Sequence, residues 1–410
     1  MKIIKLFLLL IVLLLPYRAY ADFCSDEMLL NGYEPLVNYG MDTTNNWWAI
    51  TEPIEGNYRL YVNGTHTNVF YRLTVPVFST DGTRWAAFGE DNVERYLITE
   101  LGNERITGKD FGEISFSPNS RRLVYSYFDA GIEYIVHNEK KIIAYQRVGK
   151  ICVSWSGRYI AYVAQRGDRK VININGKESV LYDDIIPIGF WNDDKMLYAA
   201  KTGTNWEIYK GNDPISLSYK SINEAKINLE GNVAAVLATE FSGMQVSILI
   251  SDDYYEPLIG KQYDWAGGLA LHPTLPLIAY KALYNGRYII VYSSSEIEGG
   301  EETGYPMFTH DGSQMYFLGC NFHCFINIDE RKYDLKMDFD VNYPYAVKPG
   351  SETIAYSTNA TMILRLINST DMIAGKMLDE MHQPRYNWRQ DQYEALGTIN
   401  NRLYMLKCKY

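Results

Sequence analysis

The sequence predicts an all-β chain assembled from repeated units of about 37 residues, each with four short strands. Three observations lead to this prediction. One phrase recurs along the chain, in which an apolar run, a short polar turn and a second apolar run follow one another. The apolar runs are short and bounded by turn residues, which is typical of strands rather than helices. Aromatic residues make up 14% of the chain and include 35 tyrosines, and rings pack well on a half-buried sheet.

The recurring phrase is clearest as ISFSPNSRRLVY, from Ile114 to Tyr125. It returns as VFSTDGTRWAAF from Val77 and as VSWSGRYIAY from Val153. Further copies begin at Gly189, Leu269, Met307 and Ala346, and weaker copies begin at Asn45 and Ile227.

The middle residue of the second apolar run marks each repeat. The marks are Ala49, Ala86, Val124, Ala161, Leu197, Ala234, Ala279, Tyr316 and Ala355. Successive spacings are 37, 38, 37, 36, 37, 45, 37 and 39 residues, and a tenth mark, Ala395, follows after 40 more. Spacings this regular over so many residues do not arise by chance, so the chain contains nine or ten structural units.

Each unit reads as four strands. After the phrase comes a third run, such as the one from Tyr58 or the one from Tyr288, then a turn such as Asn175-Gly176 and a fourth run such as the one from Ser179. Four short strands in a unit of this length are typical of a β-propeller blade rather than of a helical solenoid.

The phrase from Phe116 to Tyr125 resembles the WD-like repeat of TolB-type propellers, whose usual form is FSPDGxxIAY. Phe78–Gly82 resembles it equally well. The resemblance is one of repeats and covers most of the chain after residue 21. It implies a propeller that acts as a scaffold in the cell envelope. TolB itself has an additional α/β domain, for which this chain has no room, and the chain lacks the G-x-S-x-G of prolyl-oligopeptidase-like enzymes, whose propellers have similar repeats.

Nine or ten units exceed the four to eight blades of common propellers. Either one unusually large ring forms, or two smaller propellers share the chain. The spacing of 45 residues between Ala234 and Ala279 places the boundary for the second arrangement near residues 252–266.

Five cysteines suggest disulfide bonds if the chain is exported. Cys320 and Cys324 flank three residues, and in a hairpin they would face each other across the loop. Cys24 and Cys408 lie near the two ends of the chain. The segment around Cys24 is expected to supply the outer strand of the last blade, with a Cys24–Cys408 bridge; the alternative is that these cysteines are free or pair elsewhere. Cys152 reads as a buried small hydrophobe.

The first residues predict export. Lys2 and Lys5 precede a wholly apolar run from Leu6 to Leu15, and Ala19-Tyr20-Ala21 is a pattern that signal peptidase cleaves. Residues 1–21 are therefore expected to be a signal peptide and residues 22–410 a secreted or periplasmic protein without a transmembrane segment. The alternative is an uncleaved anchor, for which the apolar run is short.

The formal net charge of −10 argues against nucleic acid as a partner, because no basic surface is visible. Asp81 and Asp311 are expected to cap their own turns, and His272 and His310 occupy equivalent turns. We therefore expect no catalytic, cofactor-binding or metal-binding residues. The expected function is a scaffold that binds protein partners on a propeller face; the alternative is a propeller that binds or hydrolyses a small ligand or glycan at its channel mouth.

Overall fold

The computed structural model describes residues 24–137, 140–143, 147–335, 345–351, 353–357, 361–366 and 372–409. All regular structure in these residues is β, arranged as a β-propeller fold of ten antiparallel blades, each with four strands. In blades 2, 8 and 10 the first strand is interrupted and forms two short segments. The predicted fold class is confirmed, with ten units. The predicted signal peptide, residues 1–21, lies outside the described residues.

The chain forms two compact units, and the first combines its two ends, Met1–Asn68 and Tyr333–Tyr410. It contains blades 1, 9 and 10, although the last two residues of β5 belong to the second unit. Blade 1 consists of β2 (Leu36–Met41), β3 (Trp47–Ile54), β4 (Asn57–Val62) and β5 (Thr65–Phe70). Blade 9 consists of β36 (Tyr345–Val347), β37 (Thr353–Ser357), β38 (Met362–Leu366) and β39 (Met372–Ala374). Blade 10 consists of β40 (Glu380–Met381), β41 (Arg385–Asn387), β42 (Gln392–Ile399), β43 (Arg402–Cys408) and β1 (Cys24–Leu30).

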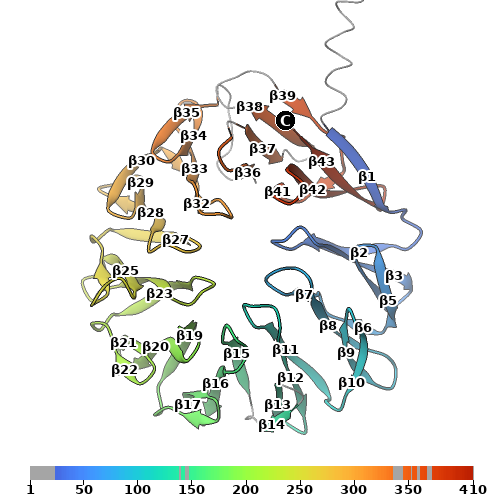
Figure 1. The fold of residues 1–410 in the computed structure, drawn as a ribbon, viewed down its shortest axis with the longest axis horizontal. Helices are drawn as coiled ribbons and strands as arrows, with labels where there is room; N and C mark the ends of the chain where they lie inside the picture. The colour runs from blue at the N-terminus through green and yellow to red at the C-terminus, as the bar shows by residue number, and fades with distance from the viewer. Residues whose placement is uncertain are drawn as a thin grey trace, which may run out of the picture. The chain divides into compact units, whose positions relative to one another are not determined.

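The second unit, Val69–Lys332, contains blades 2 to 8 in chain order. Within it, the first strands of successive blades lie on one side of the row and the fourth strands on the other (Figure 1). Blade 2 consists of β6 (Arg72–Leu73), β7 (Val77–Phe78), β8 (Trp85–Glu90), β9 (Arg95–Thr99) and β10 (Gly102–Ile106). Blade 3 consists of β11 (Asp110–Phe116), β12 (Leu123–Asp129), β13 (Ile132–His137) and β14 (Lys140–Ile143). Blade 4 consists of β15 (Val148–Val153), β16 (Ile160–Arg166), β17 (Arg169–Ile174) and β18 (Lys177–Glu178).

The remaining blades of the second unit follow the same order. Blade 5 consists of β19 (Asp184–Trp191), β20 (Lys195–Thr202), β21 (Asn205–Lys210) and β22 (Asp213–Pro214). Blade 6 consists of β23 (Ser221–Ile227), β24 (Val233–Thr239), β25 (Gln245–Ser251) and β26 (Leu258–Ile259). Blade 7 consists of β27 (Trp265–Leu271), β28 (Ile278–Tyr284), β29 (Arg287–Tyr292) and β30 (Ser295–Gly300). Blade 8 consists of β31 (Glu302–Thr303), β32 (Met307–Phe308), β33 (Met315–Cys320), β34 (Cys324–Ile328) and β35 (Arg331–Asp334), of which the last spans the division between the units.

Blade 10 takes its outer strand from the other end of the chain. The blue β1 pairs antiparallel with the red β43, in a register that places Cys24 opposite Cys408 (Figure 1). These two cysteines form a disulfide, and a second disulfide joins Cys320 to Cys324 across the hairpin between β33 and β34. Both disulfides are therefore the ones expected from the sequence. Cys152 is buried and free, as expected.

Blades pack on one another through the alternation of side chains along the second strand. In blade 7, Ala279 faces blade 8 and contacts the cluster that contains Met315 and Phe317. The next residue, Tyr280, faces blade 6 and packs in the cluster that contains Leu249. The small residue and the aromatic residue of the recurring phrase therefore serve opposite faces of the same blade.

This alternation shifts three of the repeat marks by one residue. In blade 1 it is Trp48, rather than Ala49, that pairs with Gly40, while Ala49 faces blade 10. In blade 6 it is Ala235, rather than Ala234, that pairs with Lys226 and faces blade 7, while Ala234 faces blade 5. In blade 10 the equivalent position is Glu394 rather than Ala395, because Glu394 pairs with the residue two positions before the turn. A shift of one residue matters because it exchanges the two faces of a strand.

The turn between the first and second strands begins with a polar side chain in most blades. In blade 3 the Ser117 hydroxyl donates to Asn119 Oδ1 at 2.7 Å and accepts from the Arg122 N–H at 2.9 Å. The same arrangement recurs as Ser79 with Asp81 and as Thr309 with Asp311. The expectation that Asp81 and Asp311 cap their own turns is confirmed.

At this end of the second unit, each blade from blade 2 to blade 7 also forms a hydrogen bond with the turn of the next blade. His272 illustrates the contact: its Nε2 donates to Gly312 O of blade 8 at 2.9 Å, while its Nδ1 accepts from two N–H groups of its own turn. Equivalent bonds join Asp81 N to Ser120 Oγ, His137 Nε2 to Gly157 O, Ser156 N to Asp193 Oδ1, Asn192 N to Gly231 O, and Asn228 Nδ2 to Pro273 O. Every neighbouring pair from blade 2 to blade 8 is therefore joined at this end.

The spacing of 45 residues is explained by two long loops in blade 6. Residues 252–257 join its third and fourth strands, where most other blades have a turn of two residues. Residues 240–244 join its second and third strands, again in place of a shorter turn. Residues 252–266 lie inside the second unit, and the units divide instead within β5 and β35.

Replacing Cys24 and Cys408 together by serine is expected to lower the free energy of unfolding far more than replacing Cys320 and Cys324. The sequence separations are 384 and 4 residues, for which the chain-entropy relation gives about 6 and about 2 kcal/mol. Urea unfolding of the two double variants under oxidising conditions measures the difference. Equal losses would contradict a stabilising closure of blade 10.

Gly231→Ala is expected to destabilise the chain more than Gly243→Ala. Both glycines have positive φ, at 75° and 92°, so each alanine carries a backbone strain of about 1–2 kcal/mol. A Cβ at Gly231 would also lie 2.4 Å from Phe190 O of blade 5, whereas a Cβ at Gly243 meets nothing within 4 Å. Thermal unfolding of both variants tests this, and indistinguishable midpoints would show that the turns of blades 5 and 6 are not in tight contact.

Candidate functional site

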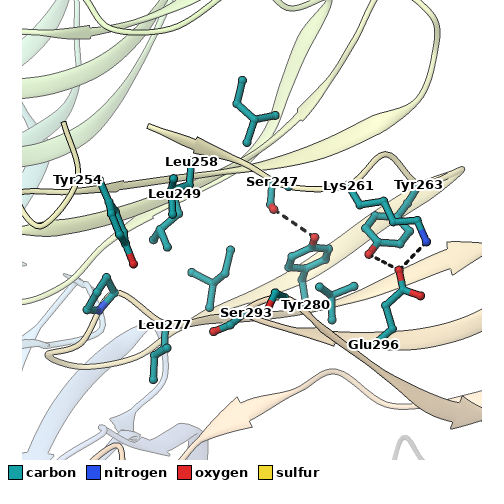
Figure 2. Close-up of a pocket in the computed structure, with 16 residues that line it drawn as sticks. Ser247, Leu249, Tyr254, Leu258, Lys261, Tyr263, Leu277, Tyr280, Ser293 and Glu296 are labelled. Atoms are coloured by element: carbon teal, nitrogen blue, oxygen red, sulfur yellow. Dashed lines mark hydrogen bonds and ion pairs between the residues drawn. The ribbon is translucent and has the colours of Figure 1, made fainter. Parts of the chain in front are cut away.

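A cavity of about 500 Å³ lies between blades 6 and 7, and we call it the blade 6–7 cavity. Its volume is within the range of about 300–1,000 Å³ that is common for binding sites. Figure 2 shows its residues, with Tyr254 and Glu296 at opposite ends and Tyr280 between them. The lining is Ser247, Leu249, Tyr254, Leu258, Ile259, Gly260, Lys261, Tyr263, Pro276, Leu277, Ile278, Tyr280, Val291, Ser293, Ser294 and Glu296.

The long loop of blade 6, residues 252–257, builds one wall of the cavity. Its base is fixed on blade 5, because Asp252 accepts hydrogen bonds from Trp191 Nε1 at 3.0 Å and from Asn192 Nδ2 at 2.5 Å. Tyr254 then lies over the apolar end of the cavity, across from Leu277 (Figure 2). The insertion that interrupts the repeat is therefore what creates this wall.

The opposite end of the cavity is polar. Glu296 Oε1 accepts from Lys261 Nζ and from the Tyr263 hydroxyl, each at 2.8 Å. These two partners hold the pKa of Glu296 below its usual value, and Glu296 in turn raises the pKa of Lys261. Burial, followed by the hydrogen bond to Glu296, raises the pKa of Tyr263. The end is thus an ion pair capped by a neutral hydroxyl.

The middle of the cavity contains a second pair of hydroxyls. The Tyr280 and Ser247 oxygens lie 3.1 Å apart, and both side chains are buried. Burial raises the pKa of Tyr280, so its hydroxyl stays protonated. Gly260 lies beside this pair, and a Cβ there would approach Ser247 Oγ to 2.3 Å. A side chain at Gly260 would therefore collide with the Ser247 hydroxyl.

Exposed apolar side chains occur at the apolar end of the cavity and next to it in the chain, and we call these four residues the apolar rim. Tyr255 is fully exposed, Ile259 and Leu275 are each 51% exposed, and Leu258 is 47% exposed. Leu258 and Ile259 also line the cavity. Aliphatic walls, protonated hydroxyls and a compensated ion pair are groups that bind and orient a ligand.

An equivalent groove lies between blades 2 and 3, where Tyr125 occupies the position of Tyr280. Its hydroxyl reaches Glu104 Oε1 at 3.2 Å. The lining there includes Arg84, Arg121 and Arg122, so the groove is strongly charged. The two grooves share a backbone frame and differ in the side chains that line them.

A wider cavity of about 750 Å³ lies along the first strands and their turns, from blade 4 to blade 8. It is lined by apolar side chains such as Ile188 and Met307 and by Lys150, Lys226 and His310. Within the described residues that line it there is no carboxylate.

None of the predicted site residues lines the blade 6–7 cavity. Cys320 and Cys324 belong to blade 8, and Cys24 and Cys408 to blade 10. Lys261, Tyr263 and Glu296 were not anticipated, because nothing in one sequence relates the connector of blade 6 to the fourth strand of blade 7. Tyr254 could have been suspected from the sequence, because it lies within the long spacing of 45 residues that indicates an insertion in this repeat.

No three histidine, cysteine or acidic side chains among the described residues come together as a metal site. The part of the chain that the structure describes also has no helix of the length and apolarity needed to span a membrane.

No known family profile matches the chain, and no curated protein matches it. Several solved structures are similar in fold. A eukaryotic initiation factor is 8% identical with a TM-score of 0.46, over 83% of this chain and 90% of that one. The Dos1 propeller is 8% identical with a TM-score of 0.38, over 73% and 93%. The propeller domain of the Trilobed protease from Pyrococcus furiosus is 13% identical with a TM-score of 0.34, over 65% and 95%. No family assignment follows from these similarities.

Tyr263→Phe is expected to lower the free energy of unfolding by about 1 kcal/mol at pH 7, because a hydrogen bond to a partly exposed carboxylate is lost. The folded-state pKa of Glu296 is lowered, so this contribution is present above the unfolded value near 4.5 and is lost as the pH falls through the folded value. The difference between wild type and variant, measured by urea unfolding, should therefore shrink between pH 6 and pH 3.

Tyr280→Phe is the matched control for Tyr263→Phe. It removes a buried hydroxyl of the same cavity, but that hydroxyl bonds to the uncharged Ser247. Tyr280 interacts with Glu296 only through Tyr263 and at longer range, so its effect on stability should change much less over the same pH range. If both variants respond alike to pH, the Tyr263 hydroxyl is not bonded to ionised Glu296.

Proposed function

We propose that this protein is an exported scaffold that binds a protein partner through the blade 6–7 cavity and its apolar rim. The observation that carries the proposal is that Leu258 and Ile259 line a cavity with aliphatic walls and are also exposed, at 47% and 51%. Exposed Tyr255 and Leu275 stand next to the lining residues Tyr254 and Pro276 in the chain. A partner can seat side chains in the cavity and cover the rim, which is how anchors dominate many protein interfaces.

Export is supported by the disulfides. Cys24–Cys408 and Cys320–Cys324 persist in oxidising compartments and are rare in reducing ones. The expected signal peptide, residues 1–21, agrees with this location in the periplasm or outside the cell. The similarity of the repeats to those of TolB-type propellers also favours a non-enzymatic role in the envelope.

The alternative is a propeller that binds or hydrolyses a small ligand or glycan at its channel mouth. The cavity along the first strands is where such a ligand would bind, and its lining of lysines and apolar side chains favours it less. The scaffold proposal and this alternative predict different results in a capture experiment.

The test is affinity capture from the native envelope and culture fractions with the disulfide-bonded protein. Wild type should retain a stoichiometric protein partner. A Leu258→Ser/Ile259→Ser variant should lose at least about nine-tenths of it, because apolar side chains buried by a partner contribute much of the binding free energy. Leu217→Ser is the matched control: Leu217 is 69% exposed and follows the fourth strand of the neighbouring blade 5.

Two results would overturn the proposal. One is that no stoichiometric protein is retained by wild type. The other is that the Leu258→Ser/Ile259→Ser variant and the Leu217→Ser variant retain the partner equally, which would place the interface elsewhere. Urea unfolding of all the variants verifies that the substitutions leave the fold intact.

A further inference from the structure

The loop that walls the blade 6–7 cavity also sets the charge at its mouth. Asp252, Asp253 and Glu256 flank the two tyrosines of this loop. Asp252 is engaged with blade 5, through Trp191 and through Lys210 Nζ at 3.3 Å. Asp253 and Glu256 are exposed, and among the described residues neither is in an ion pair.

The nearby lysines do not compensate these two carboxylates. Lys261 is held by Glu296 at the far end of the cavity, and Lys210 is held by Asp252. The loop that contributes Tyr254 to the cavity therefore carries two exposed carboxylates that form no ion pair among the described residues. A partner that covers the rim must bring its own positive charge near Asp253 and Glu256, or it leaves these charges facing an apolar interface.

The cavity is elongated rather than round. Tyr254 and Glu296 mark its two ends in Figure 2, and Ser247, Tyr280 and Ser293 lie between them. An extended segment fits such a groove because it can place side chains in the apolar end while its backbone reaches the hydroxyls in the middle.

On the basis of the proposed function, we propose that the partner binds with an extended peptide segment in which apolar residues alternate with lysine or arginine. The apolar residues occupy the space between Tyr254 and Leu277. The basic residues lie beside Asp253 and Glu256. The acidic loop thus selects among apolar segments by their charge. Complementary charges across an interface affect the specificity and the association rate of binding more than its overall affinity.

The test uses three fluorescein-labelled octapeptides: the alternating basic and apolar GKLKFRLG, its charge-reversed counterpart GELEFDLG, and GKSKSRSG, in which the apolar residues are serine. Fluorescence anisotropy with the whole disulfide-bonded protein should show binding of the first peptide at least about tenfold tighter than of either counterpart. Higher ionic strength should weaken this binding, since exposed charges are screened beyond about 10 Å at 0.1 M salt.

Variants separate the two parts of the recognition. Asp253→Asn/Glu256→Gln should weaken binding of the basic peptide by about threefold to tenfold and abolish the preference over the charge-reversed one. Tyr254→Ala should weaken binding of both apolar peptides. Asp168→Asn is the matched control, because Asp168 is an exposed acid in a turn of blade 4. Equal binding of the three peptides, or a preference that survives Asp253→Asn/Glu256→Gln, would overturn the inference.

Failure of this inference differs from failure of the proposed function. If capture of a partner depends on Leu258 and Ile259 while the peptides show no charge preference, the scaffold proposal is supported and the inferred basic segment of the partner is wrong. If capture yields no partner, the scaffold itself fails, whatever the peptides do.

Discussion

Each blade of this protein is a sheet with two apolar faces, and neither face can be left in water. The second strand shows the constraint most directly, because Ala279 is buried on one side and Tyr280 on the other. A single blade is therefore unstable alone, and its stability depends on a neighbour at each side. The bonds between successive turns, such as that from His272 to Gly312, fix the spacing at which those faces meet.

The same constraint explains what the sequence could predict. Alternating apolar runs and turn residues are local signals, so the strands, the turns around Asp81 and Asp311, and the repeat are all visible in one chain. The three misplaced marks, Ala49, Ala234 and Ala395, show the limit: in a run of consecutive apolar residues the sequence does not show which residue faces which blade.

The site is less predictable than the fold because it belongs to no single repeat. Lys261 and Glu296 meet only after two blades have packed, and each looks like an ordinary exposed charge in its own repeat. The groove between blades 2 and 3 has the same frame and an arginine-rich lining. A propeller therefore presents equivalent grooves many times, and loop length and side chains make one of them distinctive. In blade 6 the longer loop supplies Tyr254 and the acids beside it.

The pairing of β1 with β43 has a consequence for the order of folding. During synthesis, Cys24 emerges 384 residues before Cys408, which at about 5–20 residues per second is a delay of roughly 20–80 s. Blades 1 to 9 can assemble in order during synthesis, but β1 has no partner until the last strand arrives. An unpaired strand is an aggregation hazard. The acidic residues Asp26 and Glu27 lie in β1. Charged side chains on an unpaired strand disfavour its pairing with strands of other chains.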